Sequence, residues 1–285
     1  MHMNGFLQVI SSFFYGIIEG ITEWLPISST GHLILYERFF PVGDNAFTEM
    51  FRVVIQLGAI MAVVILYWNK LNPFSKTKSP EVKRYTWRLW VLVLIGCLPA
   101  ALIGLPLDKW IDSVFYNELT VALTLIIYGV AFIVVENMIK KGKIQTRIKS
   151  FNKVDMKLAL LIGCFQVLAL IPGTSRSGIT IIGAMLLGCT RGLAAEYSFF
   201  LSIPVMFGAS LVKCLKLGRE MATTGDVFTG SEIGALIVGI LTAFIVSIVA
   251  IKFLMNFIKK HDFKIFGWYR IALGLIVLVV WIFTL

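Results

Sequence analysis

The sequence has few charged residues, and no stretch of it is polar enough to form a separate soluble domain. Charged side chains make up 15% of the 285 residues, hydrophobic ones make up 58%, and the mean hydropathy is +0.86. This composition excludes an ordinary soluble protein. The four cysteines have no paired spacing, which argues against a disulfide framework or a cysteine-based metal cluster. Neither a P-loop nor a dinucleotide-binding glycine pattern is present.

Acidic residues are scarcer than basic ones, at 16 against 26, which gives a net charge of +10. Three segments, 70–88, 140–157 and 252–270, carry 18 of the 26 basic residues. Basic residues accumulate in cytoplasmic loops of membrane proteins, so we interpret the three segments as cytoplasmic loops. The positive charge therefore predicts membrane orientation, and we expect no nucleic-acid partner.

Long apolar runs make up most of the remaining chain. Two of them, 6–25 and 158–171, end at a proline followed by a hydroxyl cluster, as re-entrant half-helices do. The others are free of charge and nearly long enough to cross a bilayer: 53–68, 89–107, 119–135, 197–212, 233–251 and 271–285. The sequence predicts a single all-α integral membrane domain with about six full transmembrane helices and two re-entrant helical hairpins.

The two broken segments are related to each other. An offset of 147 residues pairs rare polar and glycine positions: Gly16 with Gly163, Glu19 with Gln166, Ser28 with Ser175, Thr30 with Ser177, Gly31 with Gly178, and Glu49 with Glu196. We interpret this as an internal repeat, with repeat one at about 1–137, repeat two at about 154–285, and a basic cytoplasmic loop at 138–157 between them. The charge distribution makes the second repeat inverted, so the two hairpins would meet near the bilayer midplane.

Two glutamates, Glu19 and Glu23, lie one helical turn apart in the first broken segment. A carboxylate at mid-bilayer depth costs roughly 2.5–3.5 kcal/mol on insertion scales, so such a pair indicates a functional site. Two ionised carboxylates this close repel each other, which requires either a proton or a cation between them. Oxygen ligands suit Mg²⁺ or Ca²⁺, and the alternative is a protonated, hydrogen-bonded structural pair.

A hydroxyl cluster follows each proline. In the first segment Ser28, Ser29 and Thr30 suit a helix start, where free N–H groups bind anions, and His32 lies close enough to serve as an acid or base. The second segment, PGTSRSG at 172–178, carries Arg176, whose planar fork favours phosphate. Arg176 could alternatively neutralise Glu19 or Glu23 as a structural ion pair.

These motifs resemble the undecaprenyl-pyrophosphate phosphatase family of bacteria, which is linked to bacitracin resistance. The resemblance rests on the Glu19/Glu23 pair with the following PISSTGH and on PGTSRSG at 172–178, and it extends over the whole chain. It implies hydrolysis of C55 polyprenyl pyrophosphate to the monophosphate and inorganic phosphate. This reaction recycles the lipid carrier of peptidoglycan synthesis and so serves cell-wall biogenesis and cell shape.

The resemblance also implies a location, partners and residue roles. The protein would lie in the bacterial cytoplasmic membrane with its site open to the extracytoplasmic side, and would need Mg²⁺ or Ca²⁺. Bacitracin would compete for the polyprenyl pyrophosphate lipid. The resemblance does not decide between a monomer and a homodimer. The metal-binding or acid/base residues would be Glu19 and Glu23. The other catalytic candidates would be Ser29 as nucleophile, His32 as acid/base or alternative nucleophile, and Arg176 as phosphate clamp. The substrate-binding residues would be Ser28, Thr30, Gly173, Thr174, Ser175, Arg176 and Ser177.

A secondary transporter or polyprenyl-phosphate flippase is the main rival, because inverted repeats with a midplane site are also transporter architecture. A structural scaffold would leave the intramembrane charges unexplained.

Overall fold

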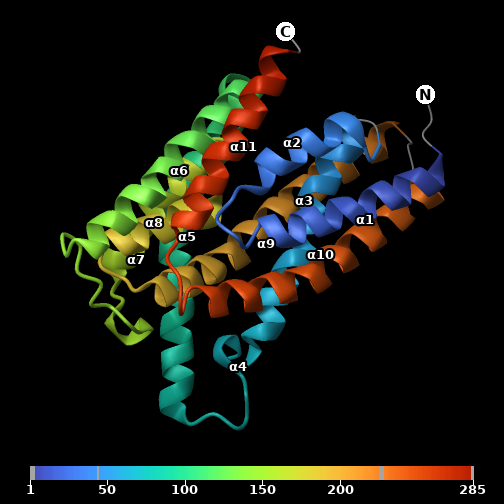
Figure 1. The fold of residues 1–285 in the computed structure, drawn as a ribbon. Coiled ribbons are helices and arrows are strands. Elements are labelled where there is room, and N and C mark those ends of the chain that lie inside the picture. The colour runs from blue at the N-terminus through green and yellow to red at the C-terminus, as the bar shows by residue number, and fades with distance from the viewer. Residues whose placement is uncertain (1–3, 44, 225–227, 284–285) are drawn as a thin grey trace.

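The protein is all-helical over residues 4–43, 45–224 and 228–283, which the computed structural model describes (Figure 1). The first half contains α1 (Gly5–Thr22), α2 (Ser29–Phe39), α3 (Asn45–Leu66), α4 (Trp68–Leu71), α5 (Pro80–Phe115) and α6 (Glu118–Lys140). The second half contains η1 (Phe151–Lys153), α7 (Met156–Val167), η2 (Leu168–Leu170), α8 (Arg176–Leu186), α9 (Arg191–Thr224), α10 (Gly230–Phe257) and α11 (Lys264–Ile282).

Within the described ranges, seven helices are long and apolar enough to cross a membrane. Six of them, α3, α5, α6, α9, α10 and α11, each overlap one of the six apolar runs predicted from the sequence. The run at 53–68 extends past the end of α3, and the run at 271–285 extends past α11, with positions 284–285 outside the described residues. The seventh is α1, which we had assigned to a re-entrant hairpin: its 18 residues give a length of about 27 Å. By contrast, α7 and α8, with 12 and 11 residues, reach only about 18 Å and 17 Å. The chain is therefore an all-helical, multi-pass membrane protein.

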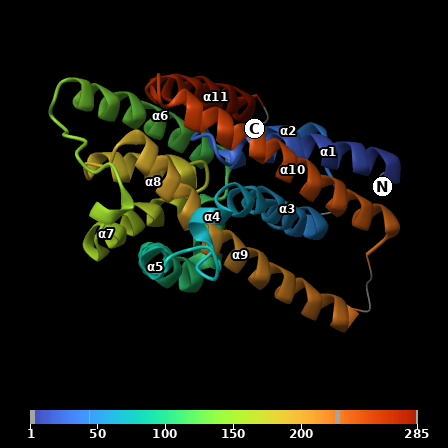
Figure 2. The ribbon, with the colours of Figure 1, turned by 90° about the horizontal axis from the view of Figure 1, so that it is seen from below.

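The main helix contacts join a helix of the first half to a helix of the second half. The principal helix pairs are α1 with α10, α6 with α11, α3 with α10, α5 with α7 and α3 with α9. Figures 1 and 2 both place α6 beside α11. Glycines allow two of these close approaches. A Cβ atom on Gly16 of α1 would lie 2.7 Å from the Gly239 carbonyl oxygen of α10, and one on Gly163 of α7 would collide with the Gly96 carbonyl oxygen of α5.

Aromatic side chains fill the centre of the bundle. Trp24, Phe199 and Phe200 are fully buried, and the ring of Trp24 meets that of Phe199 edge to face at 5.3 Å. Large apolar side chains stay exposed on the outer helix faces, such as Leu102 and Leu105 on α5, as expected for surfaces that contact lipid tails. The interior against which the polar turns pack is therefore dense and apolar.

Candidate functional site

The turns before α2 and α8 have the same unusual backbone. Ser28 and Ser175 immediately precede the two helices with φ of 73° and 67°, a left-handed conformation that costs a non-glycine residue of order 1–3 kcal/mol. Each serine caps its helix, because its hydroxyl accepts a hydrogen bond from the N–H group three residues on, Gly31 or Gly178. Strained residues of this kind cluster at functional sites.

Three of the predicted residues form a connected chain between the two turns. The Ser29 hydroxyl donates to Glu23 Oε2 at 2.9 Å, and Arg176 Nη2 donates to Glu23 Oε1 at 2.7 Å. The Glu23–Arg176 ion pair joins residues 153 positions apart, and both side chains are about 10% exposed. Partial burial strengthens such a charge-assisted contact relative to one at the surface. The structure therefore brings nucleophile candidate, carboxylate and guanidinium together.

Arg176 keeps donors for a ligand in addition to its contact with Glu23. Its Nη1 atom donates to the Ser198 carbonyl oxygen at 2.9 Å, and its guanidinium carbon lies 5.9 Å from the centre of the Trp24 ring. A guanidinium has five N–H bonds, and the two oxygen contacts use one on each terminal nitrogen. The ion pair with a glutamate, which the sequence offered as the alternative to phosphate binding, is therefore present. The remaining N–H groups of Arg176 still allow it to bind a phosphate.

Glu19 lies one turn before Glu23 and is fully buried. Neither of its carboxylate oxygens has a hydrogen-bond partner among the described residues. A buried carboxylate without partners is stable only if it is protonated or if a cation lies beside it. No group of three or more histidine, cysteine, aspartate or glutamate side chains that could hold a metal ion gathers in the described part of the chain.

The predicted hydroxyls divide into accessible and structural ones. Ser29, Thr30 and Ser175 are partly exposed, whereas Ser28, Thr174 and Ser177 are buried. The Ser177 hydroxyl donates to the Glu23 carbonyl oxygen at 3.0 Å, which ties the second turn to the first. Gly173, at φ 85°, leaves no room for a side chain, since a Cβ atom would collide with Thr124. The side chains of Thr174 and Ser177 are therefore covered by protein, and Gly173 has no space for one.

His32 has both ring nitrogens engaged, but not with Ser29. Its Nδ1 atom lies 2.7 Å from the Ser28 carbonyl oxygen, and its Nε2 atom lies 2.7 Å from the Tyr269 hydroxyl oxygen. The structure therefore places His32 at the edge of the site, between the first turn and α11.

Sequence reasoning missed Arg270, which we had counted with the basic segment 252–270. This prediction was wrong for Arg270, because the residue lies inside α11 and is fully buried. Its guanidinium donates to the main-chain carbonyl oxygens of Pro26 at 3.3 Å, Gly173 at 2.9 Å and Thr174 at 3.0 Å, and so fastens both turns. The available signal was its position next to a long apolar run, where a charge requires a buried partner.

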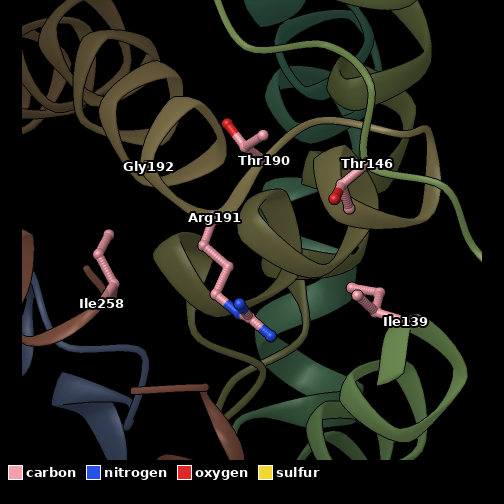
Figure 3. Close-up of a pocket in the computed structure, with 6 residues that line it drawn as sticks. All are labelled: Ile139, Thr146, Thr190, Arg191, Gly192 and Ile258. Atoms are coloured by element: carbon pink, nitrogen blue, oxygen red, sulfur yellow. The ribbon is translucent and has the colours of Figure 1, made fainter. Parts of the chain in front are cut away.

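A cavity of about 200 Å³ lies at the start of α9 (Figure 3). None of the predicted site residues lines it. Its arginine, Arg191, donates two hydrogen bonds to the buried Glu136 at 2.7 Å and 2.5 Å, so this charge is already neutralised. The lining residues are Ile139, Thr146, Thr190, Arg191, Gly192 and Ile258. The candidate site is therefore the junction of the two turns.

Known proteins resemble this chain over almost its full length. The model of the family described as bacitracin resistance protein BacA matches residues 12–276. The undecaprenyl-diphosphatase of Acetivibrio thermocellus is 59% identical over 274 residues, which cover 96% of this chain and 97% of the relative. That of Enterococcus faecalis is 56% identical over 280 residues, covering 98% and 99%. The resemblance inferred from the two motifs is thereby confirmed, and the chain belongs to the bacitracin resistance protein BacA family.

Proposed function

We propose that this protein is a membrane phosphatase that hydrolyses undecaprenyl diphosphate to undecaprenyl phosphate and inorganic phosphate. The observation that carries the proposal is the Ser29–Glu23–Arg176 contact, in a chain more than half identical to relatives named undecaprenyl-diphosphatase. A hydroxyl hydrogen-bonded to a carboxylate is an activated nucleophile, and an arginine beside it can bind the phosphate that the nucleophile attacks.

We propose that Ser29 attacks the terminal phosphorus and that Glu23 Oε2 takes the hydroxyl proton. The bond from Ser29 Oγ to phosphorus forms as the bridging oxygen leaves with undecaprenyl phosphate, and water then hydrolyses the phosphoserine. Glu23 is favoured over His32 as the proton acceptor, because it already accepts the Ser29 hydrogen bond at 2.9 Å. Arg176 and the accessible hydroxyls of Thr30 and Ser175 would bind the phosphate oxygens.

A divalent cation, Mg²⁺ or Ca²⁺, fits beside Glu19. This glutamate has no partner for its charge among the residues described, whereas Glu23 is neutralised by Arg176. Mg²⁺ is commonly held by one or two carboxylates together with substrate phosphates and water, which matches a site with two glutamates. When bound, the ion would neutralise charge on the diphosphate. In our proposal Glu19 is the main protein ligand and Glu23 the second.

We also propose that the two halves are inverted repeats whose broken helices form re-entrant hairpins. Adding 147 to the bounds of α2, Ser29–Phe39, gives 176–186, which are the bounds of α8. The glycine contacts of α1 with α10 and of α7 with α5 correspond under the same offset at Gly16 and Gly163. Lysines also pair across the halves, Lys70 with Glu196 and Lys213 with Glu49, both at 2.7 Å.

We propose that the site opens on the extracytoplasmic side of the membrane. There the enzyme would recycle the carrier lipid for peptidoglycan synthesis.

Hydrolysis in detergent tests the proposed function and its nucleophile together. We expect the purified protein to release inorganic phosphate from undecaprenyl diphosphate when a divalent metal is present. After an acid quench of a single turnover, label from the terminal phosphate should remain on the wild type and be absent from Ser29→Ala. A transporter or flippase would release no phosphate. Hydrolysis without labelled protein, together with an active Ser29→Ala variant, would exclude Ser29 as the nucleophile.

We expect Arg176→Lys to reduce kcat by a factor of about 10²–10³, the usual loss when one donor to a transition-state oxygen is removed. One ammonium group cannot keep the contacts with Glu23 and Ser198 and also bind a phosphate. Arg191→Lys is the matched control, because it changes a second partly exposed arginine bound to a glutamate elsewhere in the protein. Turnover near the wild-type value in Arg176→Lys would make Arg176 purely structural.

The metal site is tested by thermal unfolding in Mg²⁺ and in EDTA. Saturating Mg²⁺ should raise the Tm of the wild type, since a ligand at 100 times its Kd stabilises the folded state by about 2.7 kcal/mol. Glu19→Gln should lose this rise, and in EDTA it should be at least as stable as the wild type because it removes an unpartnered buried charge. Glu49→Gln, at an exposed ion pair with Lys213, should respond normally. An unchanged response in Glu19→Gln would place the metal elsewhere.

The inverted arrangement is tested at two positions related by the offset, Phe40 after α2 and Leu187 after α8. We expect a membrane-impermeant maleimide to label Phe40→Cys on intact cells and Leu187→Cys only after permeabilisation. The unsubstituted protein, with its four native cysteines, provides the background. Labelling of both positions from the same side would exclude the inversion.

A further inference from the structure

His32 and Tyr269 form a closely fitted pair between α2 and α11. The Tyr269 hydroxyl oxygen lies 2.7 Å from His32 Nε2, and the two rings are stacked, with centroids 5.6 Å apart and planes inclined by 9°. The residues are 237 positions apart in the sequence. Tyr269 is 46% exposed, so its ring is not needed to fill the core. The contact therefore acts on the orientation of His32.

The hydrogen bonds determine which nitrogen of His32 carries the proton. A carbonyl oxygen only accepts hydrogen bonds, so the 2.7 Å contact with the Ser28 carbonyl requires a proton on Nδ1. In a neutral ring Nε2 then has the lone pair and accepts from the Tyr269 hydroxyl. With both nitrogens engaged in this way, His32 cannot accept a proton from Ser29.

The position of Tyr269 is itself constrained by its neighbour on α11. Consecutive residues of an α-helix point about 100° apart, so Tyr269 faces His32 while Arg270 faces the bundle interior. Arg270 donates to Pro26, Gly173 and Thr174, the residues that build both turns. The same helix thus connects the orientation of His32 to the geometry of the turns.

We infer that Tyr269 is a positioning residue: by donating to Nε2 it holds the His32 ring in the orientation in which Nδ1–H meets the Ser28 carbonyl, at the edge of the phosphate site. The expected effect of Tyr269 on turnover rests on the proposed phosphatase activity, whereas its effect on the His32 ring does not. The His32 ring is thereby held in one orientation beside the start of α2, where Ser29 and Thr30 lie. Removal of the Tyr269 hydroxyl keeps the stacked ring but lets the His32 ring rotate away from the Ser28 carbonyl, so that either nitrogen can carry the proton.

The tautomer is measured by ¹⁵N NMR of the full-length protein in detergent micelles, with histidine labelled in the ring. The chain has only three histidines, so comparison with His32→Ala assigns the signals of His32. We expect one dominant form in the wild type, with the proton on Nδ1, and a mixture of forms in Tyr269→Phe. Tyr36→Phe is the matched control, because it removes a hydroxyl that contacts Ser11 and leaves His32 untouched.

Turnover of undecaprenyl diphosphate supplies the second readout. We expect Tyr269→Phe to reduce kcat about tenfold with KM changed less than twofold, and to cause no further loss in a His32→Ala background, as coupled residues behave. Tyr36→Phe should keep the wild-type kcat. An unchanged tautomer and kcat in Tyr269→Phe, or losses that add to those of His32→Ala, would overturn the inference. Absence of hydrolysis by the wild type would instead count against the proposed function, while the NMR result would still decide the tautomer.

Discussion

Charges buried in an apolar membrane protein need partners, and this requirement shapes the site. Glu23 meets it through Arg176 and Ser29, and the partner comes from a turn 153 residues away. Arg270 meets it differently, through main-chain carbonyl oxygens of both turns. Each arrangement joins the two broken segments, so the charges that would destabilise an isolated helix hold the halves together. Removing one member of such a set would leave an uncompensated charge, which is the costly case for buried ion pairs.

The same requirement explains why Glu19 differs from Glu23. Glu19 lies in the last turn of α1 and Glu23 caps its C-terminus, yet only Glu23 forms an ion pair with Arg176. Glu23 is thereby neutralised by Arg176 and oriented toward Ser29. Glu19 is left to bind a cation or a proton. Two chemically identical groups acquire different roles from their surroundings, as acid–base pairs in enzymes commonly do.

The sequence alone went far toward the site because its signals were local. Glu19 and Glu23 stood out as charges in an apolar helix, and Ser28 and Ser175 as caps after prolines, since insertion cost and capping follow from neighbouring residues. Arg270 and Tyr269 were missed because their partners are main-chain carbonyls and a histidine more than 90 residues away, which leave no local pattern. The first broken segment was placed correctly for a similar reason: the predicted run at 6–25 overlaps α1, Gly5–Thr22, because the apolar run and the proline after it are both local signals.

Hydropathy by itself determined that this chain is a helical membrane protein, because transfer energies depend on composition more than on packing. The two motifs also predicted two segments that the structure brings into contact through Glu23, Ser29 and Arg176. Only the tertiary structure decided that Arg176 pairs with Glu23 rather than Glu19, that Ser177 and Thr174 are buried, and that His32 turns toward Tyr269. These choices depend on how α8 and α11 pack against the first turn, and packing of distant segments is not encoded in any local stretch of sequence.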